Sequence, residues 1–167
     1  MQLLSSLLLS LFLLIASGCD SNDGTDAEDF AGSYEATVSG AISQEYSGVS
    51  WFGASVQGQQ TLDAFGIGMG TTVATTNPVF SIASNQRPSE GTFTFGQTLD
   101  GGGVVATFSA GGAQVYISTS GTLRITRSTD DRLEGTFEFT ATNPLPGAGT
   151  VTVSGEFKAK GTNIGAQ

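Results

Sequence analysis

The sequence predicts an all-β fold, a single antiparallel β-sandwich or barrel of about ten short strands that ends in a three-strand meander. Three observations lead to this class. From Phe30 onward, apolar residues alternate with polar ones with a period of two. Turn-forming residues recur at intervals of about ten residues, and no amphipathic helix of useful length can be placed. Such alternation is typical of antiparallel strands that bury one face and leave the other in water.

The expected strands of the first part of this body each offer an apolar face. Residues 33–39 place Tyr34, Ala36 and Val38 on one side, and residues 64–70 alternate apolar residues with glycine. Residues 46–56 mix their faces around two adjacent aromatic residues, as a β-bulge would. The further inward-facing residues expected here are Phe65, Ile67, Met69, Phe80, Ile82, Phe93, Phe95, Val104, Ala106, Phe108, Val115 and Ile117.

The three-strand meander occupies residues 120–160, where the alternation is clearest. Its inward-facing residues are expected to be Leu123, Ile125, Leu133, Phe137, Phe139, Val151, Val153, Phe157 and Ala159. The polar turn "STDD" at 128–131 and the proline loop "NPLPGAG" at 143–149 separate its strands. The repeated starts "GTFTF", "GTLRI" and "GTFEF" suggest that each glycine ends a turn and each threonine begins a strand.

An apolar segment without charged side chains precedes the β-rich body. It covers residues 1–18, and its densest part, Leu7 to Ala16, has the length of a signal-peptide core, roughly 7–15 residues. A membrane-spanning helix would need about 20 apolar residues. Small residues then lead into the single cysteine of the chain, Cys19. We therefore expect a signal peptide at 1–18, an acidic flexible tether at 19–29 and one β domain at 30–167.

The stretch Ala16-Ser17-Gly18-Cys19 resembles the lipobox of bacterial lipoprotein signal peptides. The resemblance implies that a peptidase removes residues 1–18 and that the Cys19 thiol carries a diacylglyceryl group. Two acyl chains hold a protein on a bilayer far better than one chain does. The implied partner is a membrane, reached through the lipid anchor.

The acidic strip after Cys19 resembles the export signal that sends lipoproteins of Bacteroidota to the outer face of the outer membrane. A second sorting rule, from enterobacteria, reads Asp20 as retention at the inner membrane. The C-terminal strands also resemble a family of small Bacteroidota lipoproteins, through Gly121 to Thr126, Gly135 to Phe139 and Gly155 to Phe157. We expect an outer-membrane lipoprotein exposed at the cell surface, with the periplasmic side and the inner membrane as open alternatives.

Composition excludes several kinds of chemistry. The chain has no histidine, which rules out Ser-His-Asp and Cys-His nucleophiles and His-ligated metals, and one cysteine cannot form an internal disulfide. The net charge is -9, and five of the 15 acids lie between Asp20 and Asp29. No basic stripe is present that could neutralise phosphates, so nucleic acid is not an expected partner. No metal and no cofactor is expected.

Few residues of the body are candidates for chemistry. Glu134 and Glu138 share a strand face, but four residues at ~3.3 Å each separate them by about 13 Å, wider than the ~5–9.5 Å of glycosidase carboxylates. Trp51 and Phe52 are adjacent and must face opposite ways, so one belongs in the core and the other is a candidate exposed platform for a sugar ring.

The sequence thus favours a lipid-anchored, non-enzymatic binding or structural module. The alternatives left open are a carbohydrate-binding accessory protein, a weak carboxylate-dependent glycosidase, and assembly with a partner membrane protein through an exposed sheet edge.

Overall fold

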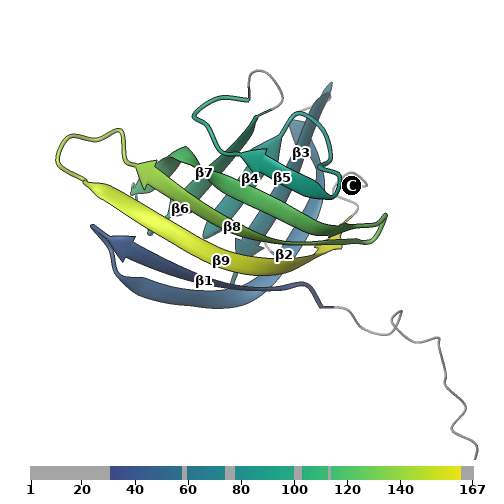
Figure 1. Cartoon of the computed structure of the whole chain (residues 1–167), viewed down its shortest axis with the longest axis horizontal. Helices are drawn as coiled ribbons and strands as arrows, with labels where there is room; N and C mark the ends of the chain where they lie inside the picture. The colour runs from purple at the N-terminus through teal and green to yellow at the C-terminus, as the bar shows by residue number, and fades with distance from the viewer. Residues whose placement is uncertain (1–30, 58–59, 74–77, 100–102, 113, 163–167) are drawn as a thin grey trace, which may run out of the picture.

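The computed structural model describes residues 31–57, 60–73, 78–99, 103–112 and 114–162. These residues contain nine strands and no helix (Figure 1). The strands are β1 Ser33–Gly40, β2 Gln44–Gln57, β3 Gln60–Gly70, β4 Phe80–Ser84, β5 Gly91–Thr94, β6 Val104–Ser109, β7 Val115–Ser128, β8 Arg132–Thr142 and β9 Thr150–Gly161. The expected three-strand meander is confirmed as β7, β8 and β9.

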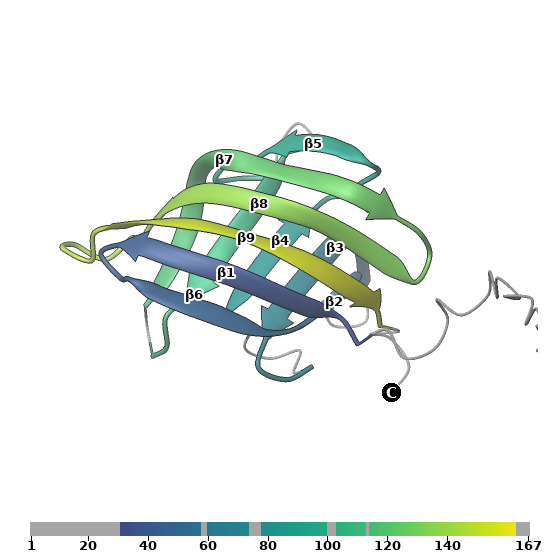
Figure 2. The same ribbon diagram turned by 60° about the horizontal axis from the view of Figure 1, so that its bottom comes forward.

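Eight of these strands close into an antiparallel barrel. Along the chain, β1, β2, β3, β4, β6, β7, β8 and β9 each pair with the next of these strands, and β9 pairs back onto β1. The strands β1, β9, β8 and β7 lie side by side and cross in front of the more steeply inclined β3, β4 and β6 (Figure 2). The short β5 is an addition that pairs with β7. The predicted all-β fold is confirmed, and the form observed is the barrel.

The strands β1, β2 and β9 meet at a seam, because β2 extends beyond its last pair with β1. Beyond the last β1 pair, β2 turns to the end of β9 and pairs with it in parallel, Trp51 with Lys160 and Phe52 with Gly161. The buried Ser50 hydroxyl lies 3.0 Å from the carbonyl oxygen of Ser33 and 2.7 Å from that of Lys158, to which it donates. One side chain therefore links all three strands at the seam.

The observed strand β7 differs from the sequence-based expectation in two ways. Two separate strands were expected at 113–118 and 121–128, but they form one strand with a register shift between Ser118 and Ser120. The shift exchanges the faces, so Tyr116 and Ser118 point inward. The predicted burial of Val115 and Ile117 is wrong: Val115 is exposed and Ile117 is half-buried. The merging of two strands into one also reduces ten strands to nine.

The inserted strand β5 separates β6 from β7. Strand β7 pairs with β6 only over Val115–Ile117, and farther along it pairs with β5 instead. At the fork, the buried Ser118 hydroxyl accepts the Ala106 N–H at 2.9 Å and donates to the Gly96 carbonyl at 2.6 Å. The Ser118 side chain therefore replaces backbone pairing where the two strands diverge.

Aromatic side chains fill the interior of the barrel. Phe80 stacks on Phe108 with ring centres 5.1 Å apart. The three tyrosines of the chain pack around this pair: Tyr34 and Tyr46 lie edge-on to Phe80 at 5.8 and 5.4 Å, and Tyr116 stacks on Phe108 at 5.8 Å. Rings at these separations gain attraction beyond their buried area. The inside of the barrel is thus a packed core.

Glycines on neighbouring strands provide space for several of the aromatic rings. Six glycines lie directly opposite an aromatic residue on the neighbouring strand. The pairs are Gly48 with Tyr34, Gly68 with Trp51, Gly121 with Phe139, Gly135 with Phe157, Gly155 with Phe137 and Gly161 with Phe52. An added Cβ at Gly155 would lie 2.7 Å from Cζ of Phe137, and one at Gly121 would lie 2.8 Å from Cβ of Phe139.

These positions correct the interpretation of the repeated Gly-Thr starts. Gly121 and Gly135 were expected to end turns, but both lie inside strands, in β7 and β8. Only Gly91 begins its strand, β5. A strand glycine of this kind marks a close approach of neighbouring groups rather than a turn.

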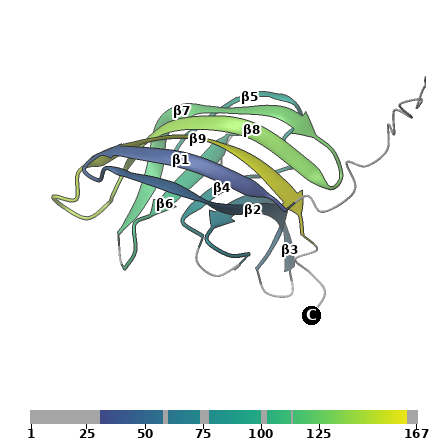
Figure 3. The same ribbon diagram turned by 90° about the horizontal axis from the view of Figure 1, so that it is seen from below.

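The two ends of the barrel differ. The loop pole is the end formed by the described residues 41–43, 71–73, 78–79, 110–112, 114 and 143–149. The terminal pole is the end where β1 begins and β9 ends, together with residues 85–90 and 128–131. The β8–β9 connection lies on the opposite side of the molecule from the end of β9 (Figure 3).

Arg87 covers the core at the terminal pole. Its guanidinium carbon lies 4.7 Å from the ring centre of Phe52 and 6.0 Å from that of Phe65. The same group donates to the carbonyl oxygens of Thr129 and Asp130 in the β7–β8 turn. A cation over aromatic faces is attracted by their electrostatic field, so Arg87 closes this end with a charge that remains hydrogen-bonded.

Candidate functional site

The lipidation site predicted from the sequence lies outside the described residues. This applies to Cys19, to the lipobox residues Ala16, Ser17 and Gly18, and to the proposed division into segments 1–18 and 19–29. The acylation of Cys19 therefore stays a prediction.

The expected exposed aromatic platform is wrong. Trp51 and Phe52 face opposite ways as predicted, but each is only 4% exposed. Phe52 belongs to the core inside the barrel. Trp51 lies on the other face of β2, where its ring covers Gly68 and Gly70 of β3. The glycines that alternate through β3 form a depression for the indole, so the ring has no free face on which a sugar could stack.

The carboxylates of Glu134 and Glu138 have different surroundings in the structure. Glu134 lies 3.5 Å from Arg132 and 4.0 Å from Arg127 in ion pairs, and it faces Lys158 across the β8–β9 ladder. Glu138 is exposed and lies opposite Thr122 and Ser154. Their predicted separation along one strand agrees with their placement at different rows of the sheet.

The aspartates of the β7–β8 turn stabilise the turn itself. The Thr129 hydroxyl donates to Oδ1 of Asp131 at 2.9 Å, and this hydrogen bond is the main cause of a lowered pKa for Asp131. A bond from its own backbone and the nearby Arg132 and Arg127 lower the pKa of the carboxyl group further. Turn aspartates commonly act in this way.

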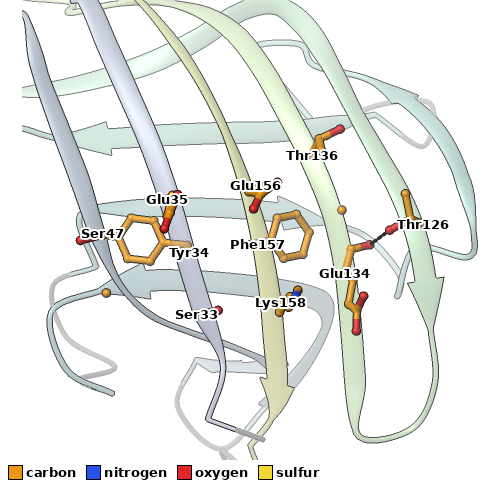
Figure 4. A pocket seen from close by; sticks show the side chains of 12 residues that line it. Ser33, Tyr34, Glu35, Ser47, Thr126, Glu134, Thr136, Glu156, Phe157 and Lys158 are labelled. Carbon is orange, nitrogen blue, oxygen red and sulfur yellow. Dashed lines mark hydrogen bonds between the residues drawn. The ribbon is translucent and has the colours of Figure 1, made fainter.

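An open groove of about 440 Å³ lies on the outer face of the barrel, over β1, β9 and β8 (Figure 4). It is lined by Ser33, Tyr34, Glu35, Ser47, Gly48, Thr126, Glu134, Gly135, Thr136, Glu156, Phe157 and Lys158. Because Tyr34 and Phe157 are buried core residues, the chemistry of the groove is that of its carboxylates, hydroxyl groups and one ammonium group.

Two carboxylates face each other in this groove. Glu35 of β1 lies directly opposite Glu156 of β9, and Thr136 of β8 comes next in the same row. Directly opposed residues have Cβ atoms about 4.5–5.5 Å apart, and like charges in such a pair destabilise a sheet. A ligand that donates hydrogen bonds to both carboxylates would relieve this repulsion, so the groove favours a ligand rich in hydroxyl or amino groups.

The opposed carboxylates Glu35 and Glu156 differ in exposure from the acids of known hydrolytic centres. Both side chains are exposed, whereas a carboxylic acid that acts as general acid at neutral pH sits in a desolvated pocket. Within the described residues, no group of three or more Asp, Glu, His or Cys side chains is placed to hold a metal ion.

No local sequence pattern indicates the Glu35–Glu156 pair. The two residues lie in the first and last strands of the barrel, and only their pairing brings them together. Glu134 and Glu138 could be recognised as a possible pair because they lie in one strand, where a period of two shows which residues share a face. Pairing between distant strands leaves no such local pattern.

The described part of the chain contains no helix long and apolar enough to cross a bilayer. No protein-family model, no curated protein and no solved structure matches this chain.

Proposed function

We propose that this protein is a lipid-anchored, extracytoplasmic β-barrel that works as a non-enzymatic binding or structural module at the outer membrane. The filled barrel interior carries the binding part of the proposal, because a core packed with aromatic rings leaves ligands only the outer surface. The lipobox-like stretch ending at Cys19 supports the anchor. The start of β1 lies at the terminal pole, at the opposite end of the barrel from the loop pole.

Mass spectrometry of the chain purified from membranes of its host tests the anchor. The expected mature chain begins at residue 19 and carries a diacylglyceryl group on the Cys19 sulfur. The Cys19→Ala variant is the matched control, because it should stay unlipidated and leave the membrane fraction. A wild-type chain that still begins at Met1, or a Cys19 without lipid, contradicts the proposal. Protease treatment of intact cells then tests surface exposure, since an inward-facing domain is protected.

A glycan ligand is the second candidate, and the groove favours it. Glu35, Glu156, Ser33 and Thr136 offer hydrogen-bond acceptors and hydroxyl groups across adjacent strands. A glycan array compares the wild type with Glu35→Gln/Glu156→Gln, and signals that depend on this pair support a site in the groove. Glu138→Gln is the control, because this exposed carboxylate lies outside the groove on β8. Signals that survive the double substitution exclude the groove.

A further inference from the structure

The loop pole exposes apolar side chains. Among the described residues, the large hydrophobic side chains that stand exposed are Val73, Val115 and Leu145, at 60%, 39% and 55%. Val73 lies in the β3–β4 connection, Val115 at the start of β7 and Leu145 in the β8–β9 loop. All three therefore belong to the loop pole.

The loop pole also lacks charge. Its described residues, 41–43, 71–73, 78–79, 110–112, 114 and 143–149, include no Asp, Glu, Lys or Arg. The terminal pole is the opposite, with Arg87, Glu90, Asp130 and Asp131 in its two connecting segments. Apolar exposure and absence of charge thus coincide at one end of the barrel, where contact with an apolar phase would desolvate no ion.

The loop that carries Leu145 is internally ordered. The Asn143 side-chain oxygen accepts the Leu145 N–H at 2.8 Å, and the Leu145 carbonyl accepts the Ala148 N–H at 3.3 Å. The Tyr116 hydroxyl donates to the Ala148 carbonyl at 3.0 Å and so ties the loop to the barrel. Pro144 and Pro146 restrict the backbone on both sides of Leu145. The leucine is therefore held outward by a structured loop.

We propose that the loop pole makes direct contact with a lipid bilayer, with Leu145 and Val115 entering the boundary between headgroups and acyl chains. The exposed side chains stand on separate loops, and none of them lines the groove over β1, β9 and β8. A protein partner needs a continuous complementary area of roughly 800 Å² on each side, whereas a bilayer adapts to separate apolar tips. Binding of this kind scales with the apolar area buried.

The tether is long enough for this contact, a step that rests on the proposed lipid anchor. Fourteen peptide steps separate Cys19 from Ser33, and at ~3.3–3.6 Å each they span at most about 46–50 Å. The twelve residues of β9 extend about 40 Å at ~3.3 Å each. A barrel attached at its terminal pole can therefore tip its loop pole onto the same bilayer, and attachment raises the effective concentration enough for a weak contact to matter.

The experiment replaces the natural anchor with an artificial one. The chain from Asp20 onward contains the complete barrel and its core, and an N-terminal histidine tag holds it on phosphatidylcholine vesicles that carry a nickel-chelating lipid. A fluorophore is placed at Leu145→Cys, and at Thr122→Cys on the exposed outer face of β7 as the control. Quenching by bromine-labelled acyl chains is expected at position 145 and not at position 122.

A second measurement uses the unlabelled, untagged chain from Asp20 onward. Flotation with phosphatidylcholine vesicles should show Leu145→Asn binding about fivefold more weakly than the parent chain, because part of one leucine side chain loses its apolar contact. Added phosphatidylglycerol should not strengthen binding, because the pole carries no positive charge.

Three results overturn the proposal: equal quenching at positions 145 and 122, no effect of Leu145→Asn on flotation, or a dimer in light scattering that Leu145→Asn abolishes. The last result assigns the pole to a second copy of the chain. Because the anchor is artificial or absent in both measurements, none of these results bears on the acylation of Cys19.

Discussion

Gly155 has no room for a side chain, because a Cβ there would collide first with the backbone carbonyl oxygen of Glu35 and then with the Phe137 ring at 2.7 Å and the Ala36 methyl group at 2.9 Å. The neighbours on both sides belong to paired strands and cannot move freely. We expect Gly155→Ala to lower the free energy of unfolding by ~1–3 kcal/mol, the usual cost of overpacking a core. Chemical denaturation followed by circular dichroism measures the change.

The matched control is Gly66→Ala in β3. An added Cβ at Gly66 meets nothing within 4 Å, and this glycine also lies in a strand. The free energy of unfolding should change by no more than ~0.5 kcal/mol. Equal destabilisation by both substitutions would contradict the view that close neighbours at Gly155 set the cost.

Tyr34 carries a buried hydroxyl group without a hydrogen-bond partner among the described residues. Burial raises the pKa of Tyr34 above its ordinary value of 10.0, and the nearby Tyr46 raises it further. The folded barrel therefore keeps Tyr34 protonated at a pH where the unfolded chain ionises it. The stability that this group contributes is complete below pH ~10 and is lost as the pH rises above that value.

The Tyr34→Phe variant should remove this alkaline loss. At pH 7 its free energy of unfolding is expected to equal that of the wild type or to exceed it by up to ~1 kcal/mol, because an unsatisfied polar group is removed without loss of the ring. Above pH 10 the gap should widen in favour of the variant. Burial also raises the pKa of Tyr46, so this second group should leave some pH dependence of the unfolding free energy in the variant. Parallel slopes for both proteins would contradict this role of Tyr34.

At the scale of elements, the fork between β6 and β7 depends on one hydroxyl group. Ser118→Ala leaves the Ala106 N–H and the Gly96 carbonyl without their partner in a buried place. We expect a loss of ~1–3 kcal/mol in the free energy of unfolding, together with faster hydrogen exchange at the Ala106 amide. The control is Ser120→Ala, an exposed position two residues along the same strand. Unchanged exchange at Ala106 would argue against the bridging role.

Most strands were predictable because a residue such as Val153 or Phe139 has polar neighbours on both sides, and a period of two identifies a half-buried strand. Strand β7 shows where this fails. The register shift near Ser118 reverses the inward face, so Val115 and Ile117 looked buried in the sequence although Tyr116 occupies the core. A bulge has no fixed sequence signature, and its position depends on how two other strands diverge.

The roles of Gly121 and Gly135 were predicted wrongly for a related reason. Gly121 and Gly135 precede threonine and a strand-like pattern, and glycine before such a pattern ordinarily indicates a turn. Their true role depends on Phe139 and Phe157, which face them from the next strand. The burial of Trp51 could not be predicted from its sequence neighbours either, since it depends on Gly68 of β3. Local sequence shows which residues are small or large, but pairing decides which of them meet.

At the scale of the whole molecule, the closure of β1 on β9 brings the two ends of the barrel chain together. Ser33 lies opposite Lys158, three residues before the end of β9. A circular permutant that joins residue 162 to residue 31 by a short glycine-serine linker, with new ends between Gly111 and Gly112, should keep the fold. Both glycines are exposed, and exposed loops tolerate such breaks.

Circular dichroism and thermal unfolding test the permutant against the linear chain that starts at Phe30. The spectra should match, and the midpoint temperatures should agree to within about 5 °C. A permutant that is unfolded at room temperature would show that the ends are farther apart than the β1–β9 pairing implies.

The candidate groove belongs to this scale as well, which explains why no single stretch of sequence predicted it. Its opposed carboxylates, Glu35 and Glu156, come from the two strands that close the barrel. The loop pole could not be predicted from the sequence either, because Val115 and Leu145 come to the same end of the barrel only after β7, β8 and β9 have paired. Composition and local period predicted the class of fold, and the sites arise from contacts between distant parts of the chain.

The pairing of glycine with an aromatic ring has a consequence for how this protein can evolve. Each ring fills the volume that the facing residue has given up, so the two positions are inherited as one unit. A descendant that gains a methyl group at position 155 must lose carbon atoms at position 137 and also shift the backbone at position 35, and the loss of the ring alone opens a void. In an alignment of descendants, such columns would vary together while the strands around them diverge.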